Sequence, residues 1–184
     1  IVEQRVTQPE AFDALRWIVR RYGESAPLSG NPAQPPYLRI YPTAQVLATI
    51  PSWDWHRARV DSARYSTVYR FTQRADALKR LGATGRIAHL AAALDDIPGV
   101  GPWSVAETLQ GFCGHPDAVS VGDYHLAHTV GFAFTGERTD DAGMLRLLAP
   151  YAGHRQRVVR LIQEAGIRKP RYGARMSIPD YRDF

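Results

Sequence analysis

Five residues near the middle of the chain, Pro98-Gly99-Val100-Gly101-Pro102, restrict the possible folds more than any other segment. Neither proline suits a helix interior, and glycine adopts positive φ values without a steric penalty. Apolar residues recur at helical spacing on both sides of this turn. They are Ile87, Leu90, Ala91 and Leu94 before it and Val105, Leu109 and Phe112 after it. Residues 84–113 are therefore predicted to form a helix-hairpin-helix, with Gly82 ending the preceding helix and Thr84 capping the first helix of the hairpin.

The second helix of the hairpin is expected to begin at Pro102, which leaves the N–H groups of its first turn facing outward. These groups and the positive end of the helix dipole suit a phosphate, which would be held without readout of the bases. An ordinary corner between two core helices is the alternative interpretation of the hairpin alone. The predicted phosphate-binding residues are Gly99, Val100, Gly101, Trp103, Ser104 and Arg155.

A carboxylate follows the hairpin at a distance of about twenty residues. The apolar run Val119-Ser120-Val121 leads to Gly122-Asp123-Tyr124, and a helical pattern begins directly afterwards. Asp123 is therefore placed at the start of a helix, where an aspartate commonly serves as an N-cap. A catalytic role is the second interpretation, and the hairpin upstream favours it.

The hairpin I-P-G-V-G-P-W at 97–103, followed at this distance by G-D-Y at 122–124, resembles the helix-hairpin-helix DNA glycosylase superfamily. It is most similar to the bacterial 3-methyladenine DNA glycosylase II branch. Residues 1–6 resemble the opening helix of that family, and 149–155 resemble its Pro-aromatic pocket segment. The resemblance implies an all-α, two-lobed glycosylase core over 1–184, acting in base excision repair.

The same resemblance implies further properties. Asp123 corresponds to the catalytic aspartate of the superfamily, and carbonyl oxygens near Gly99 and Gly101 correspond to those that often hold a monovalent cation, Na⁺ or K⁺. The glycosylase II branch usually carries a β-rich domain ahead of this core, so the chain is expected to be a fragment that lacks an N-terminal domain.

Breaking the bond between a base and C1′ builds positive charge on the sugar. An ionised Asp123 would stabilise that charge or activate the attacking water, and both roles stay open. The base must first leave the duplex, and aromatic rings then attract a cationic alkylated purine such as 3-methyladenine or 7-methylguanine. The expected pocket residues are Trp103, Glu107, Tyr124 and Tyr151. Core packing is the alternative for each ring, and Glu107 suggests hydrogen bonding to a neutral base.

The residue after G-V-G-P indicates the reaction type. Relatives that also cut the strand have a lysine there, whose amine forms a Schiff base. Trp103 occupies this position, and the two lysines, Lys79 and Lys169, lie elsewhere. We therefore expect a monofunctional enzyme that leaves an abasic site. A glycosylase for oxidised or deaminated bases and a non-catalytic DNA-binding module remain the alternatives.

The cysteine content and the charge narrow the class of protein. Cys113 is the one cysteine, which excludes an intrachain disulfide and a four-cysteine iron-sulfur cluster, and no cofactor is expected. His125 and His128 lack further metal ligands in the sequence pattern, so no metal is predicted for them.

Residues 151–184 carry the whole net charge of +5, and their end, 168–184, is predicted to be a basic extended tail. Such a basic region suits a polyanion, although many soluble proteins carry one for solubility alone. The resemblance implies that the partner is double-stranded DNA with a damaged base.

No apolar run reaches the roughly 18 residues of a membrane helix, so no membrane partner is expected. We expect a monomer in the cytoplasm or nucleoid. A proline-rich loop over 25–36 is followed by Tyr37 and Leu38, which are candidates for filling the emptied base stack, although a plain surface loop is the alternative. Of Trp53 and Trp55, we expect one to lie in the core and the other to cover it.

Overall fold

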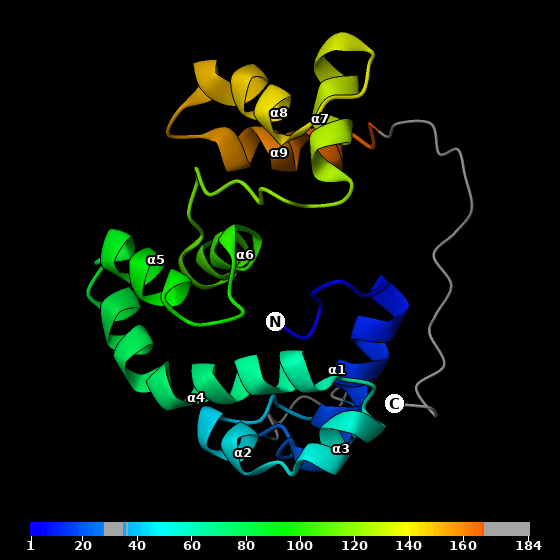
Figure 1. Cartoon of the computed structure of the whole chain (residues 1–184), viewed down its shortest axis with the longest axis vertical. Coiled ribbons are helices and arrows are strands. Elements are labelled where there is room, and N and C mark those ends of the chain that lie inside the picture. Colours follow the sequence, from blue (N-terminus) through cyan, green and yellow to red (C-terminus); the bar gives the residue numbers. More distant parts are fainter. Residues whose placement is uncertain (28–34, 36, 168–184) are drawn as a thin grey trace. The chain divides into compact units, whose positions relative to one another are not determined.

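The computed structural model describes residues 1–27, 35 and 37–167. Within these residues the chain consists of helices joined by turns, with one isolated antiparallel bridge between Ser25 and Arg39 (Figure 1). They divide into two compact units, the first comprising 1–77 and 97–99 and the second the remainder. The all-α class and the two lobes are confirmed. The predicted basic tail, 168–184, lies outside the described residues.

The first unit contains α1 (Gln8–Tyr22), α2 (Ala44–Thr49), α3 (Ser52–Arg57) and the first part of α4 (Ser62–Ala83). Thr7 caps α1 through a capping box with Glu10, whose side chain accepts a hydrogen bond from the Thr7 amide (2.8 Å). Because this cap needs an extended backbone at Thr7, no helix can run through it from the N-terminal side. The expectation that 1–6 form a helix is wrong, since these residues form turns.

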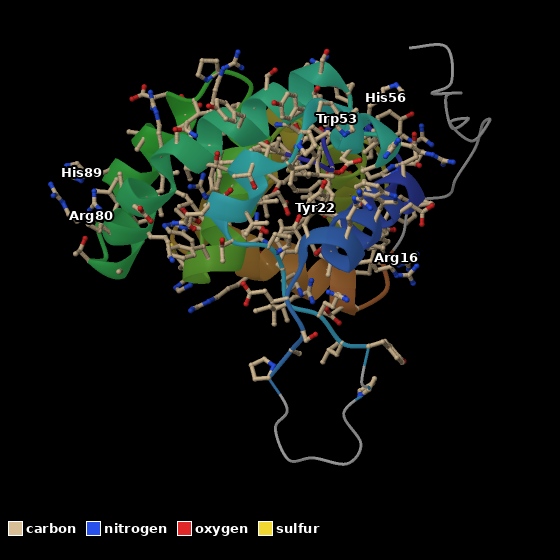
Figure 2. All side chains as sticks on the ribbon, turned by 90° about the horizontal axis from the view of Figure 1, so that it is seen from below. Arg16, Tyr22, Trp53, His56, Arg80 and His89 are labelled. Carbon is tan, nitrogen blue, oxygen red and sulfur yellow. The ribbon has the colours of Figure 1, made fainter. Side chains whose placement is uncertain are left out.

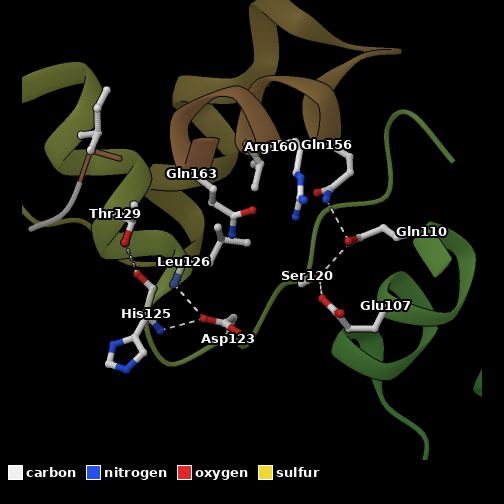
Figure 3. Close-up of a pocket in the computed structure, with 12 residues that line it drawn as sticks. Glu107, Gln110, Ser120, Asp123, His125, Leu126, Thr129, Gln156, Arg160 and Gln163 are labelled. Atoms are coloured by element: carbon white, nitrogen blue, oxygen red, sulfur yellow. Dashed lines mark hydrogen bonds between the residues drawn. The ribbon is translucent and has the colours of Figure 1, made fainter. Parts of the chain in front are cut away.

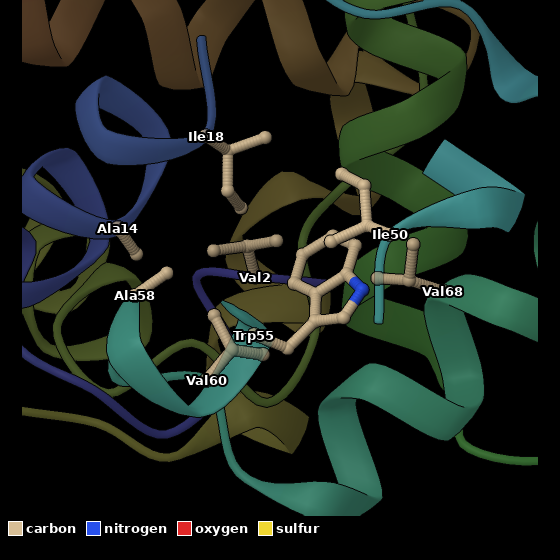
Figure 4. Close-up of a cluster of buried hydrophobic side chains, with 8 residues drawn as sticks. All are labelled: Val2, Ala14, Ile18, Ile50, Trp55, Ala58, Val60 and Val68. Carbon is tan, nitrogen blue, oxygen red and sulfur yellow. The ribbon is translucent and has the colours of Figure 1, made fainter. Parts of the chain in front are cut away.

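Trp55 lies at the centre of the apolar core of the first unit (Figure 4). Its neighbours there come from the N-terminal turns, from α1 and α4, and from the residues that directly follow α2 and α3. They are Val2, Ala14, Ile18, Ile50, Ala58, Val60 and Val68. Trp53, by contrast, is 64% exposed on the surface (Figure 2). The expected division between a core tryptophan and an outer one is confirmed.

A buried carboxylate, Asp54, connects α3 to α1. It accepts hydrogen bonds from Arg21 (3.1 Å), from Arg57 (3.3 Å) and from the hydroxyl of Tyr22. The hydrogen bond from Tyr22, together with the two arginines, lowers the pKa of Asp54 despite its burial. Asp54 therefore stabilises the packing of α3 against α1. The tryptophans on either side of it in the sequence differ in environment, since Trp55 is buried and Trp53 is exposed.

The second unit contains the end of α4, α5 (Ile87–Asp95), α6 (Pro102–Cys113), α7 (Leu126–Thr135), α8 (Asp141–Leu148), the short 3₁₀ helix η1 (Ala149–Tyr151) and α9 (Arg155–Glu164). Helices α5 and α6 pack together, and α7 packs against α8 and α9 (Figure 1). The core between α7, α8 and α9 is made of Leu126, Ala127, Val130, Met144, Leu148, Val159 and Ile162.

The entry to the hairpin differs from the prediction. Helix α4 continues through Gly82 to Ala83, and the hydroxyl of Thr84 donates back to the carbonyl of Arg80 (2.9 Å) instead of capping α5. A Cβ atom at Gly82 would lie 2.0 Å from the ring of Phe112 in α6. Gly82 is therefore required for helix packing and does not end the helix, so both local predictions are wrong.

Candidate active site

The two glycines of the hairpin adopt different conformations. Gly99 has a φ of 95°, and a Cβ atom on it would lie 2.1 Å from Thr67 Oγ1. Gly101 is extended, with a φ of −120°, and its carbonyl accepts the first hydrogen bond of α6 from Val105 N (3.0 Å). The amides of residues 103 and 104 therefore precede the hydrogen-bond ladder, as a phosphate-binding helix N-terminus requires. Phosphate binding itself stays a prediction.

The other predicted hairpin residues differ in exposure. Val100 and Trp103 are half-buried, whereas the Ser104 side chain is buried. Contact of Ser104 with a phosphate would therefore come from its backbone amide.

Asp123 is held on both carboxylate oxygens. Its Oδ1 accepts hydrogen bonds from the amides of His125 and Leu126 (both 2.8 Å), which opens α7. Its Oδ2 accepts a hydrogen bond from the indole nitrogen of Trp103 (3.2 Å). The turn before it contains Gly122, whose amide donates to Asp141 (3.1 Å). The carboxylate thus has the cap geometry, and it also faces a pocket.

This pocket has a volume of about 420 Å³, within the range of about 300–1,000 Å³ that is usual for small-molecule sites (Figure 3). Its lining comes from α6, from the segment that leads to α7, from α7 and from the face of α9 that points toward them. Most of the lining side chains are polar, and none is aromatic apart from the imidazole of His125. The lining consists of Glu107, Gln110, Ser120, Asp123, His125, Leu126, Thr129, Gln156, Val159, Arg160, Gln163 and Ile167.

A chain of hydrogen bonds forms one wall of the pocket. The hydroxyl of Ser120 donates to Glu107 Oε1 and accepts from Gln110 Nε2 (2.8 Å). The same nitrogen of Gln110 also donates to the carbonyl of Ala118 (2.9 Å), while Gln110 Oε1 accepts from Gln156 Nε2 (2.8 Å). The wall therefore has a defined direction of donors and acceptors, from Gln156 on α9 to Glu107 on α6.

Of the four predicted pocket residues, Glu107 lines the pocket, Trp103 donates to Asp123 without belonging to the lining, and the two tyrosines lie elsewhere. Tyr124 is 85% exposed, and its ring contacts the imidazole of His125 edge-on, with 4.8 Å between centroids. Tyr151 is 41% exposed and packs against Phe134, with 5.9 Å between centroids. Neither ring lines the pocket beside Asp123, so the prediction is wrong for this pocket. In the turn before α7, the side chains of Asp123 and Leu126 face the pocket, and Tyr124 points to solvent.

Arg155 forms an ion pair with Asp117. Its Nε and backbone amide donate to Asp117 Oδ1 (2.8 and 2.9 Å), and its Nη2 donates to Oδ2 (2.5 Å). These hydrogen bonds raise the pKa of Arg155 and hold the pKa of Asp117 well below its usual range. The guanidinium is held by this partner, and phosphate binding by Arg155 stays a prediction. Its place is structural, at the start of α9.

The histidines and the hairpin carbonyls bear on metal binding. His125 lines the pocket, and His128 Nδ1 lies 2.7 Å from the carbonyl of Thr139. In the described part of the chain, no three histidine, cysteine or acidic side chains come close enough to hold a metal ion. The carbonyl of Gly99 accepts a hydrogen bond from Gln4 (2.9 Å), as that of Gly101 does from Val105. Each oxygen keeps a second lone pair, and cation binding there stays a prediction.

Comparison with known proteins identifies the fold. No protein-family model matches the chain, and neither does any curated protein sequence. Among solved structures, the DNA-3-methyladenine glycosidase of Bacillus halodurans matches 89% of the chain, with a TM-score of 0.62 and 18% identity. The 3-methyladenine DNA-glycosylase of Archaeoglobus fulgidus matches 88%, with a TM-score of 0.67 and 15% identity. This chain has a DNA glycosylase fold.

A third similar structure is MBOgg1 in complex with a low-affinity DNA ligand, which matches 90% of the chain with a TM-score of 0.67 and 15% identity. The chain spans 57% of the length of MBOgg1, 70% of the Bacillus halodurans protein and 54% of the Archaeoglobus fulgidus protein.

Sequence reasoning missed most of the pocket wall. Gln156, Arg160 and Gln163 are spaced by four and three residues and so share one face of α9, which is the signal that could have identified them. Gln110 likewise lies three residues after Glu107 on α6. Ser120 gave no such signal, since it stands in an apolar run and is placed by its hydrogen bonds.

Proposed function

We propose that this chain is the core of a DNA glycosylase that removes a damaged base from double-stranded DNA by hydrolysis. The observation that carries the proposal is the position of Asp123. Its carboxylate lines a polar pocket and is oriented by the first amides of α7 and by Trp103. The fold around it is shared with two 3-methyladenine glycosylases, and the hairpin that precedes it has the geometry of a phosphate site.

In this proposal the Asp123 carboxylate lies beside C1′ of a nucleotide turned out of the duplex. As the bond to the base breaks, positive charge develops on the sugar, and a fixed negative group stabilises it without having to reorganise. Stabilising this charge and activating water are both compatible with the geometry, because neither requires the carboxylate to leave its three hydrogen bonds.

The reaction is proposed to be monofunctional, leaving an abasic site, because Trp103 occupies the position of the Schiff-base lysine. Trp103 instead donates its indole N–H to Asp123. No cofactor is assigned a role, and the enzyme is proposed to act as a monomer on DNA in the cytoplasm or nucleoid. In the described part of the chain, no helix combines the length and the apolar character that crossing a membrane requires.

The resemblance in sequence favours alkylated purines as the bases removed. The pocket supplies a second candidate, because its lining contains hydrogen-bonding side chains where stacked rings were expected. An oxidised or deaminated base, which is read by hydrogen bonds, suits this lining better than a cation held between rings.

The test is an assay of base release from duplexes that each contain one alkylated, deaminated or oxidised base. The proposal predicts a free base and a strand that stays intact until the abasic site is cleaved by alkali. Binding to these duplexes without release of any base would support the non-catalytic module instead. A covalent complex trapped by borohydride would refute the monofunctional mechanism.

A further inference from the structure

We infer that Glu107 selects the base: its outer carboxylate oxygen accepts a hydrogen bond from a ring N–H, so that the pocket takes bases with a lactam edge, a ring N–H beside a carbonyl. Hypoxanthine, uracil and 8-oxoguanine carry this edge, whereas 1,N⁶-ethenoadenine lacks it. The inference rests on the proposed function, since it concerns the pocket beside Asp123.

The hydrogen bonds of the wall have a fixed direction. The carbonyl of Ala118 can only accept, so Gln110 must present its NH₂ group to Ala118 and to Ser120. Ser120 therefore accepts from Gln110, and its own proton is left for Glu107 Oε1. No side chain in this chain of bonds can be reversed without placing two acceptors against each other.

Two acceptor oxygens of the wall remain without a donor from the protein. With Oε1 of Glu107 bonded to Ser120, the hydrogen bonds of the described residues leave its Oε2 without a donor. At the other end of the wall, Gln156 Oε1 is buried and has no hydrogen-bond partner in the described structure. Buried polar groups usually have a hydrogen-bond partner, so Gln156 Oε1 needs a donor, whereas Glu107 is exposed and its Oε2 is open to a ligand. The wall therefore has acceptors in excess, and an N–H of a ligand would complete it.

N–H donors on α9 lie at the same pocket. Gln156 keeps one N–H that is not used by Gln110, and Gln163 and Arg160 bring further N–H groups from the same helix to the pocket (Figure 3). A lactam offers an N–H and a C=O side by side, which match an acceptor on α6 and a donor on α9. Glu107 also stands one helical turn after Trp103, whose indole holds Asp123, so the base and its sugar would be read from one helix.

The deciding variant is Glu107→Gln, because the wall fixes how the new amide is oriented. Ser120 can donate only to an oxygen, so the glutamine would turn its Oε1 to Ser120 and its NH₂ to the pocket. This change converts the acceptor into a donor at nearly unchanged size. Glu137→Gln is the matched control, because Glu137 is an exposed residue of the same unit outside the pocket.

Release of hypoxanthine and of 1,N⁶-ethenoadenine is measured from otherwise identical duplexes under single-turnover conditions. We expect the wild-type protein and Glu137→Gln to release hypoxanthine faster. In Glu107→Gln the ratio of the two rates should fall by about 10–100-fold, since a donor would face the ring N–H. An unchanged ratio in Glu107→Gln would overturn the inference.

Binding of the same duplexes with a fluorinated sugar that resists cleavage separates the inference from the proposed function. If no base is released but the hypoxanthine duplex binds more tightly in a manner that depends on Glu107, the inference stands and the catalytic function is refuted. If no base is released and neither duplex is preferred, both are refuted.

Discussion

Replacing Gly99 by alanine should destabilise the protein because this residue has a positive φ and no room for a side chain. At a φ of 95°, a Cβ atom costs about 1–2 kcal/mol in backbone strain. The new methyl group would also lie 2.1 Å from Thr67 Oγ1 and 3.1 Å from Thr67 Cβ. Thr67 is buried, and its hydroxyl is held by the carbonyl of Ala63 (2.9 Å), so it cannot simply rotate away. Relieving this overlap costs about 1–3 kcal/mol more.

The expected loss in the free energy of unfolding is therefore about 2–5 kcal/mol, which corresponds to a decrease in Tm of about 5–15 °C for a chain of this size. Urea denaturation followed by circular dichroism measures it. The matched control is Gly101→Ala, since Gly101 is in the same turn but extended, with no atom within 4 Å of the added Cβ. This control should change stability by less than about 0.5 kcal/mol.

A double variant separates the two contributions. Thr67→Ala combined with Gly99→Ala removes the contact with Thr67 Oγ1, which is the most severe part of the overlap, but keeps the backbone strain. The two substitutions should therefore be less than additive by about 1 kcal/mol or more. Equal stability of Gly99→Ala and Gly101→Ala would refute the reasoning, because it would mean that neither the positive φ nor the contact with Thr67 matters.

Three further substitutions test the second unit. Asp117→Asn should reduce the free energy of unfolding by about 1–2 kcal/mol at pH 7, after allowance for the 33% exposure of Arg155. Because the pKa of Asp117 is lowered on folding, the difference from wild type should shrink as the pH falls below about 4, and a constant difference would contradict this. Trp103→Phe, which removes the N–H donor to Asp123, should slow single-turnover base release by about tenfold. Tyr124→Phe should change the rate of base release by less than about twofold. A larger effect would show that Tyr124 takes part in the reaction after all.

The hairpin and the place of Asp123 could be predicted from sequence because both depend on local chemistry. Prolines and glycines define the turn between α5 and α6, and an aspartate before a helical pattern defines the start of α7. Such features need no knowledge of which segments meet in space.

The errors come from residues whose partners are distant in sequence. The ion pair of Arg155 with Asp117 was likewise not foreseen, because Asp117 lies 38 residues before it and meets it only in the folded chain. Gly82 was taken for the end of a helix because its contact with Phe112, in another helix, cannot be foreseen from the local pattern. The same limit applies to Tyr124 and Tyr151, because only the packing of the folded chain decides whether an aromatic ring faces a pocket.

The central claim is that the Asp123 carboxylate acts directly on the sugar of the flipped nucleotide. The most direct test is the single-turnover rate of base release by Asp123→Asn on the duplex that the wild-type protein cleaves best. The asparagine oxygen can still accept the amides of His125 and Leu126, so the fold and duplex binding should survive. Asp95→Asn, an exposed substitution at the end of α5 with the same change in charge, is the control. The account predicts a loss of at least about 100-fold in Asp123→Asn and little change in the control; an unchanged rate in Asp123→Asn would contradict it.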